Sequence, residues 1–364
     1  MSFEQFHGNS ETVRRLREMI ARDHLPHGII LTGTRGAGKF TLAQMVAKAV
    51  NCLERPVAED GLPDFCGVCR NCERIAQADA LDQRFAEAVD ARENLRESDK
   101  RETRIFVQTH PDVLVIPPDP PQMLVKVDQV RYVIGEIYYR PSEGRQKFYI
   151  FSESNFVKEA ANALLKVLEE PPEFATLFLL AENSNALLPT TRSRCITLTL
   201  APLTAEEIAQ DLALRTEWTA QQKKLVARLC GGAVGRARSF DLNGYLTARQ
   251  NALTLLTTAL GESDHSALFR ATESYRAGAE GKGKTDLLVS TLYSILEDLL
   301  FLKSGSDELL RNQDLKEDLI RIAGQVTFAW IVRASEGLSE IQSGMRRNLL
   351  RSLSLDGFSS SIEI

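Results

Sequence analysis

Residues 33–40 read GTRGAGKF, and the five residues before them, 28–32, read GIILT. The apolar run predicts a buried strand, and the pattern at 41–51 predicts a helix after the glycines. A glycine-rich turn between a strand and a helix presents backbone N–H groups to phosphate oxygens, and the lysine at its end reaches the outer phosphates. The stretch therefore indicates a phosphate-binding P-loop in an α/β domain. A tight turn that needs glycine only for its backbone conformation is the alternative.

The loop has its phosphate-binding residues but lacks a residue that binds the metal ion. The candidate nucleotide-binding residues are Gly33, Gly36, Gly38 and Lys39. The next residue is Phe40, where a hydroxyl that ligates magnesium is needed. Thr41 does not replace it, because one step along a helix rotates the side chain by about 100°. ATP or ADP stays an open candidate ligand, and we do not expect magnesium.

A second metal ligand is missing after the predicted strand at 148–151. P-loop enzymes place an aspartate after such a strand to hold the cation. Here the strand is followed by Ser152 and Glu153, so the glutamate is present and the metal-binding aspartate is replaced by serine. Phosphoryl transfer without its cation loses the main stabiliser of charge on the phosphate oxygens. We therefore predict that this chain hydrolyses ATP poorly or not at all.

The order of predicted elements separates an α/β part from an all-α part. Further strands are predicted at 113–116 and 177–180 and a helix at 159–169, an alternation that favours a parallel sheet covered on both faces. From about residue 204 helical periodicity dominates. We expect an α/β domain at 1–200, a small helical lid at 201–243 and a helical domain at 244–364. The charged segment 82–104 is predicted to be an exposed insertion, helical or flexible.

Composition and charge narrow the function classes. The 364 residues suit two or three domains, and a formal charge of −5 gives no overall basic field of the kind that a dedicated nucleic-acid binder carries. The N-terminus lacks the features of a secretory signal, and the most apolar stretch, 287–302, is interrupted by Glu297 and Asp298. We expect a cytoplasmic protein without a membrane anchor.

Four of the six cysteines lie in one short stretch. They are Cys52, Cys66, Cys69 and Cys72. Four thiolates complete a tetrahedral shell, so the spacing predicts a structural zinc module at about 52–72 without an open catalytic position. The alternative is a set of free cysteines packed in a core.

Six sequence elements occur in one order along the chain. They are GTRGAGKF, the cysteine cluster, HPD at 110–112, ANALLKVLEEPP at 161–172, SRC at 193–195 and GGAVGRA at 231–237. Together they resemble the AAA+ subunits of the bacterial DNA polymerase III clamp loader, most of all its delta-prime subunits. The resemblance runs from near the N-terminus to about residue 240. Beyond that, only helical character and length agree.

The resemblance implies roles for two arginines and for the helical domain. Arg194 of SRC would be an arginine finger that enters a neighbouring subunit's ATP site in trans, and a salt-bridged arginine at a strand edge is the alternative. Arg236 would be a second sensor that faces the chain's own nucleotide, or a structural residue. Residues 244–364 would form an oligomerisation collar with partner subunits.

The implied function is that of a mostly rigid, non-hydrolysing clamp-loader subunit. Its partners would be the ATPase motor and clamp-opening subunits and, through the complex, the sliding clamp and primed DNA. Two other functions stay open. The first is an ATP-hydrolysing gamma/tau-like motor subunit, which would need an intact magnesium site. The second is a zinc-bearing nucleic-acid binding module with a vestigial P-loop, which a basic stripe would favour.

Overall fold

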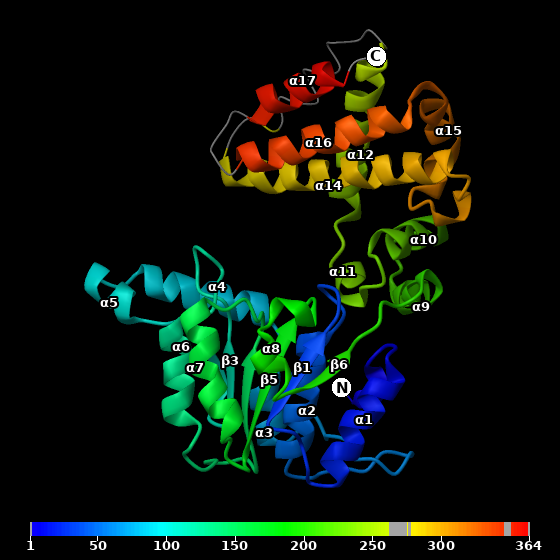
Figure 1. Ribbon diagram of the computed structural model, residues 1–364. Helices are drawn as coiled ribbons and strands as arrows, with labels where there is room; N and C mark the ends of the chain where they lie inside the picture. Colours follow the sequence, from blue (N-terminus) through cyan, green and yellow to red (C-terminus); the bar gives the residue numbers. More distant parts are fainter. Residues whose placement is uncertain (1, 262–274, 276–277, 346–350, 363–364) are drawn as a thin grey trace. The chain divides into compact units, whose positions relative to one another are not determined.

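The structure, a computed structural model, describes residues 2–261, 275, 278–345 and 351–362, and these divide into two compact units (Figure 1). The first unit comprises Met1–Asp211 and Gly232–Arg236, and the second comprises Leu212–Gly231 and Ala237–Ile364. The predicted helical domain also includes residues 262–274, 276–277, 346–350 and 363–364, which lie outside the described residues.

A six-stranded sheet forms the centre of the first unit, with the order β2-β3-β4-β5-β1-β6. Its strands are β1 (Gly28–Thr32), β2 (Val107–His110), β3 (Val113–Ile116), β4 (Lys147–Phe151), β5 (Ala175–Ala181) and β6 (Ile196–Thr199). β2 pairs with β3 in antiparallel fashion, and all the other neighbouring strands are parallel. The prediction of a mixed α/β fold with a parallel sheet is confirmed.

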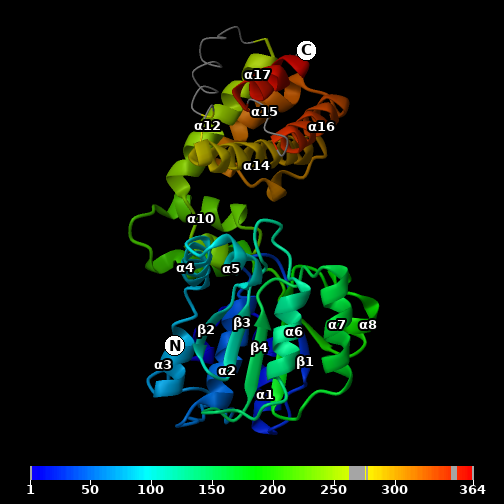
Figure 2. The same cartoon turned by 90° about the vertical axis from the view of Figure 1, so that its left-hand side faces the viewer.

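Helices cover both faces of this sheet. The main ones are α1 (Ser10–Ala21), α2 (Lys39–Asn51), α6 (Val127–Glu136) and α7 (Lys158–Glu169). Ile29 and Leu31 pack in one apolar cluster with α1 and α2, whereas Ile30 packs in a second cluster with α6 and α7. Figures 1 and 2 show α6 and α7 on one side of the sheet and α1 on the other. β1 is buried along its whole length because its alternate side chains enter two different cores.

The charged segment 82–104 is largely helical. It contains α4 (Leu81–Glu93) and α5 (Glu97–Glu102). Most of α4 is exposed or half-buried, but Arg92 is buried and forms an ion pair with Asp119, which is fully buried. The first unit also contains η1 (Phe3–Gln5), α3 (Arg70–Ala76), η2 (Ser184–Ala186), α8 (Pro189–Arg192) and α9 (Ala205–Asp211).

The second unit is built from helices. It contains η3 (Leu212–Leu214), α10 (Ala220–Leu229), α12 (Leu242–Ala259), α14 (Gly278–Lys303), η4 (Asp307–Leu309), η5 (Gln313–Leu315), α15 (Lys316–Gln325), α16 (Phe328–Met345) and α17 (Arg351–Ser361); the short helix α11 (Val234–Arg238) crosses the boundary between the units. The apolar stretch 287–302 lies within α14, and its Leu292 and Leu299 are fully buried in one core with Trp330 of α16. None of the helices in the described part of the chain is long and apolar enough to cross a membrane.

Candidate functional site

The glycine-rich loop joins β1 to α2 at the carboxyl end of the sheet. Gly36 and Gly38 have φ angles of 83° and 91°, in the left-handed region that favours glycine, and Gly38 is the N-cap of α2. A Cβ atom on Gly36 would lie 2.9 Å from Cγ of Arg236. The glycines therefore serve both the backbone conformation and a close contact. The strand, loop and helix stand in the order that a phosphate-binding loop requires.

Lys39 is turned back onto its own loop. Its Nζ donates hydrogen bonds to the carbonyl oxygens of Gly33 (2.5 Å) and Thr34 (2.9 Å). Burial lowers the pKa of Lys39, and the carboxylates of Glu182 and Glu153 act in the opposite direction. The loop carbonyls thus take the hydrogen bonds that a phosphate would receive from this lysine.

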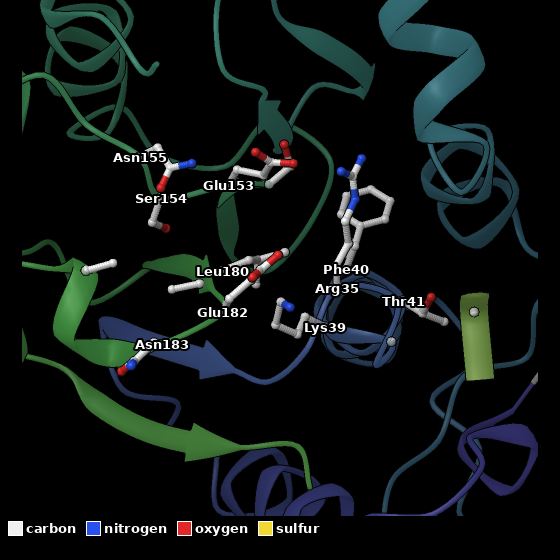
Figure 3. A pocket seen from close by; sticks show the side chains of 16 residues that line it. Arg35, Lys39, Phe40, Thr41, Glu153, Ser154, Asn155, Leu180, Glu182 and Asn183 are labelled. Carbon is white, nitrogen blue, oxygen red and sulfur yellow. The ribbon is translucent and has the colours of Figure 1, made fainter. Parts of the chain in front are cut away.

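A cavity of about 560 Å³ opens between this loop and the ends of β4 and β5. Its volume lies within the range of small-molecule sites. The residues that line it are Arg35, Gly36, Gly38, Lys39, Phe40, Thr41, Ser152, Glu153, Ser154, Asn155, Leu180, Ala181, Glu182, Asn183, Ala186 and Gly235. Figure 3 shows the side chains of Lys39, Glu153 and Glu182 directed into it. The cavity brings the sequence-predicted Lys39 and Glu153 together at the carboxyl edge of a parallel sheet, where α/β proteins usually bind ligands.

The cavity lacks the two side chains that P-loop enzymes use to hold magnesium. Phe40 lines it with a hydrocarbon ring, and Ser152 follows β4 where a carboxylate is needed. Thr41 also lines the cavity, but in Figure 3 it lies on the far side of α2 from Glu153 and Glu182. Neither of the two positions that would hold the cation therefore offers the ligand that a P-loop enzyme uses there.

Sequence reasoning missed part of the cavity wall. Glu182 and Asn183 line it directly after β5, and Asn155 lines it after β4. β5 pairs with β1 so that Ala181 lies opposite Thr32, which places Glu182 beside the start of the loop. The strand at 177–180 was predicted, but its position next to β1 could not be read from the sequence. Polar residues at the end of a predicted buried strand were the available signal.

The segment 232–236 closes one side of the loop. The backbone N–H of Gly235 donates to the carbonyl of Gly36 at 2.9 Å, and a Cβ on Gly235 would lie 2.8 Å from that oxygen. Arg236 follows with an exposed side chain, and its backbone nitrogen would lie 3.0 Å from a Cβ on Gly36. Arg236 is thus next to the loop, while Gly235 lines the cavity.

Arg194 lies in the turn between α8 and β6. Its Nη2 donates to Oε1 of Glu169 at 2.8 Å, and its Nη1 donates to the carbonyl of Thr190 at 2.9 Å. The side chain is 34% exposed. Arg194 is not among the residues that line the cavity of its own chain.

The four clustered cysteines converge at the C-terminal end of α2. Cys52 is the C-cap of α2, Cys69 is the N-cap of α3, and Cys72 lies in α3. The four Sγ atoms lie within 4.8 Å of one another, and Cys52 Sγ lies 3.6 Å from that of Cys66 and 4.0 Å from that of Cys69. Four sulfurs that surround one tetrahedral ion at about 2.3 Å are separated by about 3.8 Å. The donor set therefore fits a metal ion of the zinc type.

Backbone groups also contact these sulfurs. The N–H of Cys66 donates to Cys52 Sγ at 3.4 Å, and the N–H of Cys69 donates to Cys66 Sγ at 3.2 Å. Burial raises the pKa of the Cys69 thiol, but hydrogen bonds with the backbone of Leu53 and Cys72 outweigh it and lower this pKa to about 7. Such N–H···S bonds stabilise the thiolate form, which is the form that binds a metal.

Known proteins match the chain over most of its length. The Bacillus subtilis (strain 168) DNA polymerase III subunit delta′ is 26% identical over 316 residues, which cover 86% of this chain and 84% of that protein. The Escherichia coli (strain K12) DNA polymerase III subunit tau is 29% identical over 242 residues, 65% of this chain but only 31% of tau. A solved DNA polymerase III gamma subunit-related protein from Thermotoga maritima is 16% identical, with 97% and 98% of the chains covered and a TM-score of 0.45.

A family model described as DNA polymerase III, delta subunit matches residues 8–204, more than half of the chain. This range contains the glycine-rich loop, the cysteine cluster and Arg194. The resemblance to delta-prime clamp-loader subunits is confirmed, and the chain belongs to the DNA polymerase III delta subunit family.

Proposed function

We propose that this chain is a delta-prime-like subunit of the DNA polymerase III clamp loader, an assembly that places a sliding clamp on primed DNA during replication. It acts as a mostly rigid partner without ATPase activity of its own, within the cytoplasm. The main support for this proposal is a P-loop cavity that lacks the usual metal ligands at Phe40 and Ser152, in a chain whose Arg194 lies outside that cavity. The resemblance to clamp-loader subunits also implies an AAA+ domain at residues 1–200 and a helical lid at 201–243.

The missing cation explains why the chain would not hydrolyse ATP. Phosphoryl transfer depends on positioning and on charge stabilisation at the phosphate oxygens, and both depend on magnesium. Lys39 could offset part of that charge, but its Nζ is bonded to the carbonyl oxygens of Gly33 and Thr34. The purified chain should therefore show no steady-state ATP turnover. A turnover that Lys39→Ala abolishes would contradict the proposal.

Arg194 would serve a neighbouring subunit. An arginine finger contributes about 10³ to 10⁵ in rate when its guanidinium meets the developing phosphate charge. Arg194 is partly exposed, and Glu169 and Thr190 hold its guanidinium on the surface of the chain. An exposed ion pair is weak, so a partner's phosphate can replace Glu169 at little cost.

The cysteine cluster would hold a structural zinc ion. Cys52, Cys66, Cys69 and Cys72 are its ligands, and zinc there would supply folding free energy rather than catalysis. Cys52 and Cys72 are fully buried and connect the end of α2 to α3. The cluster thus fixes the segment between these helices against the helix that begins at the P-loop.

Residues 244–364 would assemble with partner subunits as a collar. Much of the apolar surface predicted for this domain is buried within its own core. Ile320, Phe328 and Val332 stay about half exposed, at 48%, 51% and 55%. These side chains on α15 and α16 are the apolar surface that a neighbouring collar domain would cover.

One observation favours a second function, that of a gamma/tau-like motor subunit. Tau matches 65% of this chain at 29% identity. A motor subunit must bind magnesium, and the donor set at Phe40 and Ser152 argues against it. Co-purification with partner chains and an ATPase assay of the isolated chain distinguish the two: a motor subunit turns ATP over by itself, and a delta-prime-like subunit does not.

A further inference from the structure

The charges that line the P-loop cavity are unusual for a site that holds polyphosphate. Its walls carry two cations, Arg35 and Lys39, and two carboxylates, Glu153 and Glu182. In a P-loop enzyme the magnesium ion offsets the carboxylates at the end of the strands. Here the cation's ligands are replaced by Phe40 and Ser152, while both carboxylates remain. The two carboxylates therefore balance the charge of Arg35 and Lys39 even when no phosphate is bound.

Of the two carboxylates, Glu182 is nearer to the loop. Ala181 pairs with Thr32 at the ends of neighbouring parallel strands, so Glu182 and Gly33 are the next residues after these two strands. Gly33 is the residue whose carbonyl accepts from Lys39 Nζ. Glu153 belongs to β4, one strand further from β1. Figure 3 shows the Glu182 side chain directed into the cavity on the side of Lys39.

A bound nucleoside diphosphate would bring several negative charges to the loop amides and to Lys39, next to the carboxylate of Glu182. Like charges at such short range repel each other strongly even in a partly solvated site. We propose that Glu182 is the residue that keeps nucleoside polyphosphates out of this cavity. Gly36 and Gly38 keep the left-handed backbone that such a loop needs, so this proposal assigns the exclusion to charge and not to the loss of the glycines. The inference deepens the proposed function, on which it rests, because it names what keeps this subunit out of the nucleotide cycle.

The test is a titration of the purified full chain with ADP by isothermal calorimetry, in EDTA and separately in magnesium. Glu182→Gln keeps the size and polarity of the side chain and removes its charge. We expect the Kd for ADP to fall by about tenfold or more in EDTA relative to the wild-type chain. The titration in EDTA is the decisive one, because magnesium binds ADP in solution and offsets part of the phosphate charge that Glu182 would repel. A thermal melt checks that the variant is folded. If Gln perturbs the fold, Glu182→Ala, which also lacks the charge, should lower the Kd for ADP in the same way.

Two controls locate the effect. Glu206→Gln removes the same charge from an exposed position of α9 outside the cavity, and it should leave the Kd unchanged. Lys39→Ala in the Glu182→Gln background should abolish the gain, because the phosphate would then lack its lysine. A Glu182→Gln chain that binds ADP no better than Glu206→Gln overturns the inference. That outcome leaves the proposed function untouched, since assembly with partners and the effect of Arg194 are measured on the complex.

Discussion

Replacing Gly36 by alanine tests the contact that joins the P-loop to the segment 232–236. Alanine at a φ of 83° costs about 1 kcal/mol because the left-handed conformation strains an L-residue. The added Cβ would also lie 2.9 Å from Cγ and 3.0 Å from the backbone nitrogen of Arg236, and relief of that overlap costs about 1–3 kcal/mol more. Gly36→Ala should therefore lower the free energy of unfolding of the first unit by about 2–4 kcal/mol.

Gly61 supplies a matched control. Its φ is 78°, and an added Cβ would meet nothing within 4 Å, so Gly61→Ala should cost about 1 kcal/mol. Both tryptophans, Trp218 and Trp330, belong to the second unit, so tryptophan fluorescence would not report on this change. Amide hydrogen exchange in peptides that cover β1 and β5 measures it directly. Equal destabilisation by the two substitutions would refute the contact with Arg236.

Two further predictions concern other parts of the molecule. Cys72→Ser should reduce the zinc content from one ion per chain to a small fraction and should increase hydrogen exchange in α3. Elemental analysis of protein purified without chelator measures the zinc content. A wild-type chain without zinc would contradict the site. In the second unit, the fully buried carboxylate of Asp298 accepts hydrogen bonds from the backbone nitrogens of Arg311 (2.7 Å) and Asn312 (3.0 Å). Asp298→Ala should lower the free energy of unfolding by about 3 kcal/mol, because it leaves these donors unpaired. Glu297→Ala, at the half-exposed neighbouring position, should lower it by less than about 1 kcal/mol. Urea unfolding followed by tryptophan fluorescence compares them, and equal midpoints would contradict the assignment.

The sequence was most informative where strands are buried on both faces. β1, β3, β4 and β5 consist mainly of apolar residues and were predicted close to their observed bounds. β2 and β6, at the two edges of the sheet, were not predicted, because edge strands bury only some of their residues and alternate with polar ones. The charged segment 82–104 was predicted to be exposed, and most of it is. Arg92 is the exception, because its partner Asp119 lies 27 positions away and is brought close only by the fold.

The parts of the candidate site that depend on nearby residues were predicted, and the parts that depend on the fold were not. Local motifs identified the glycine-rich loop and the four cysteines, since their chemistry depends on spacing along the chain. Glu182 was missed because its importance depends on which strand lies next to β1, and strand order is a property of the whole sheet. The partner of Arg194, Glu169, was missed likewise, because it is 25 residues away at the end of α7.

We propose that Arg194 of this chain enters a neighbouring subunit's ATP site. The most direct test is ATP turnover by a clamp loader reconstituted with the Arg194→Ala chain, compared with Arg14→Ala, a substitution of an exposed arginine on α1. We expect both complexes to assemble normally and the Arg14→Ala complex to turn ATP over like wild type. Arg194→Ala should lower turnover at the site it faces by about 10³ or more. Unchanged turnover in an intact Arg194→Ala complex would contradict it.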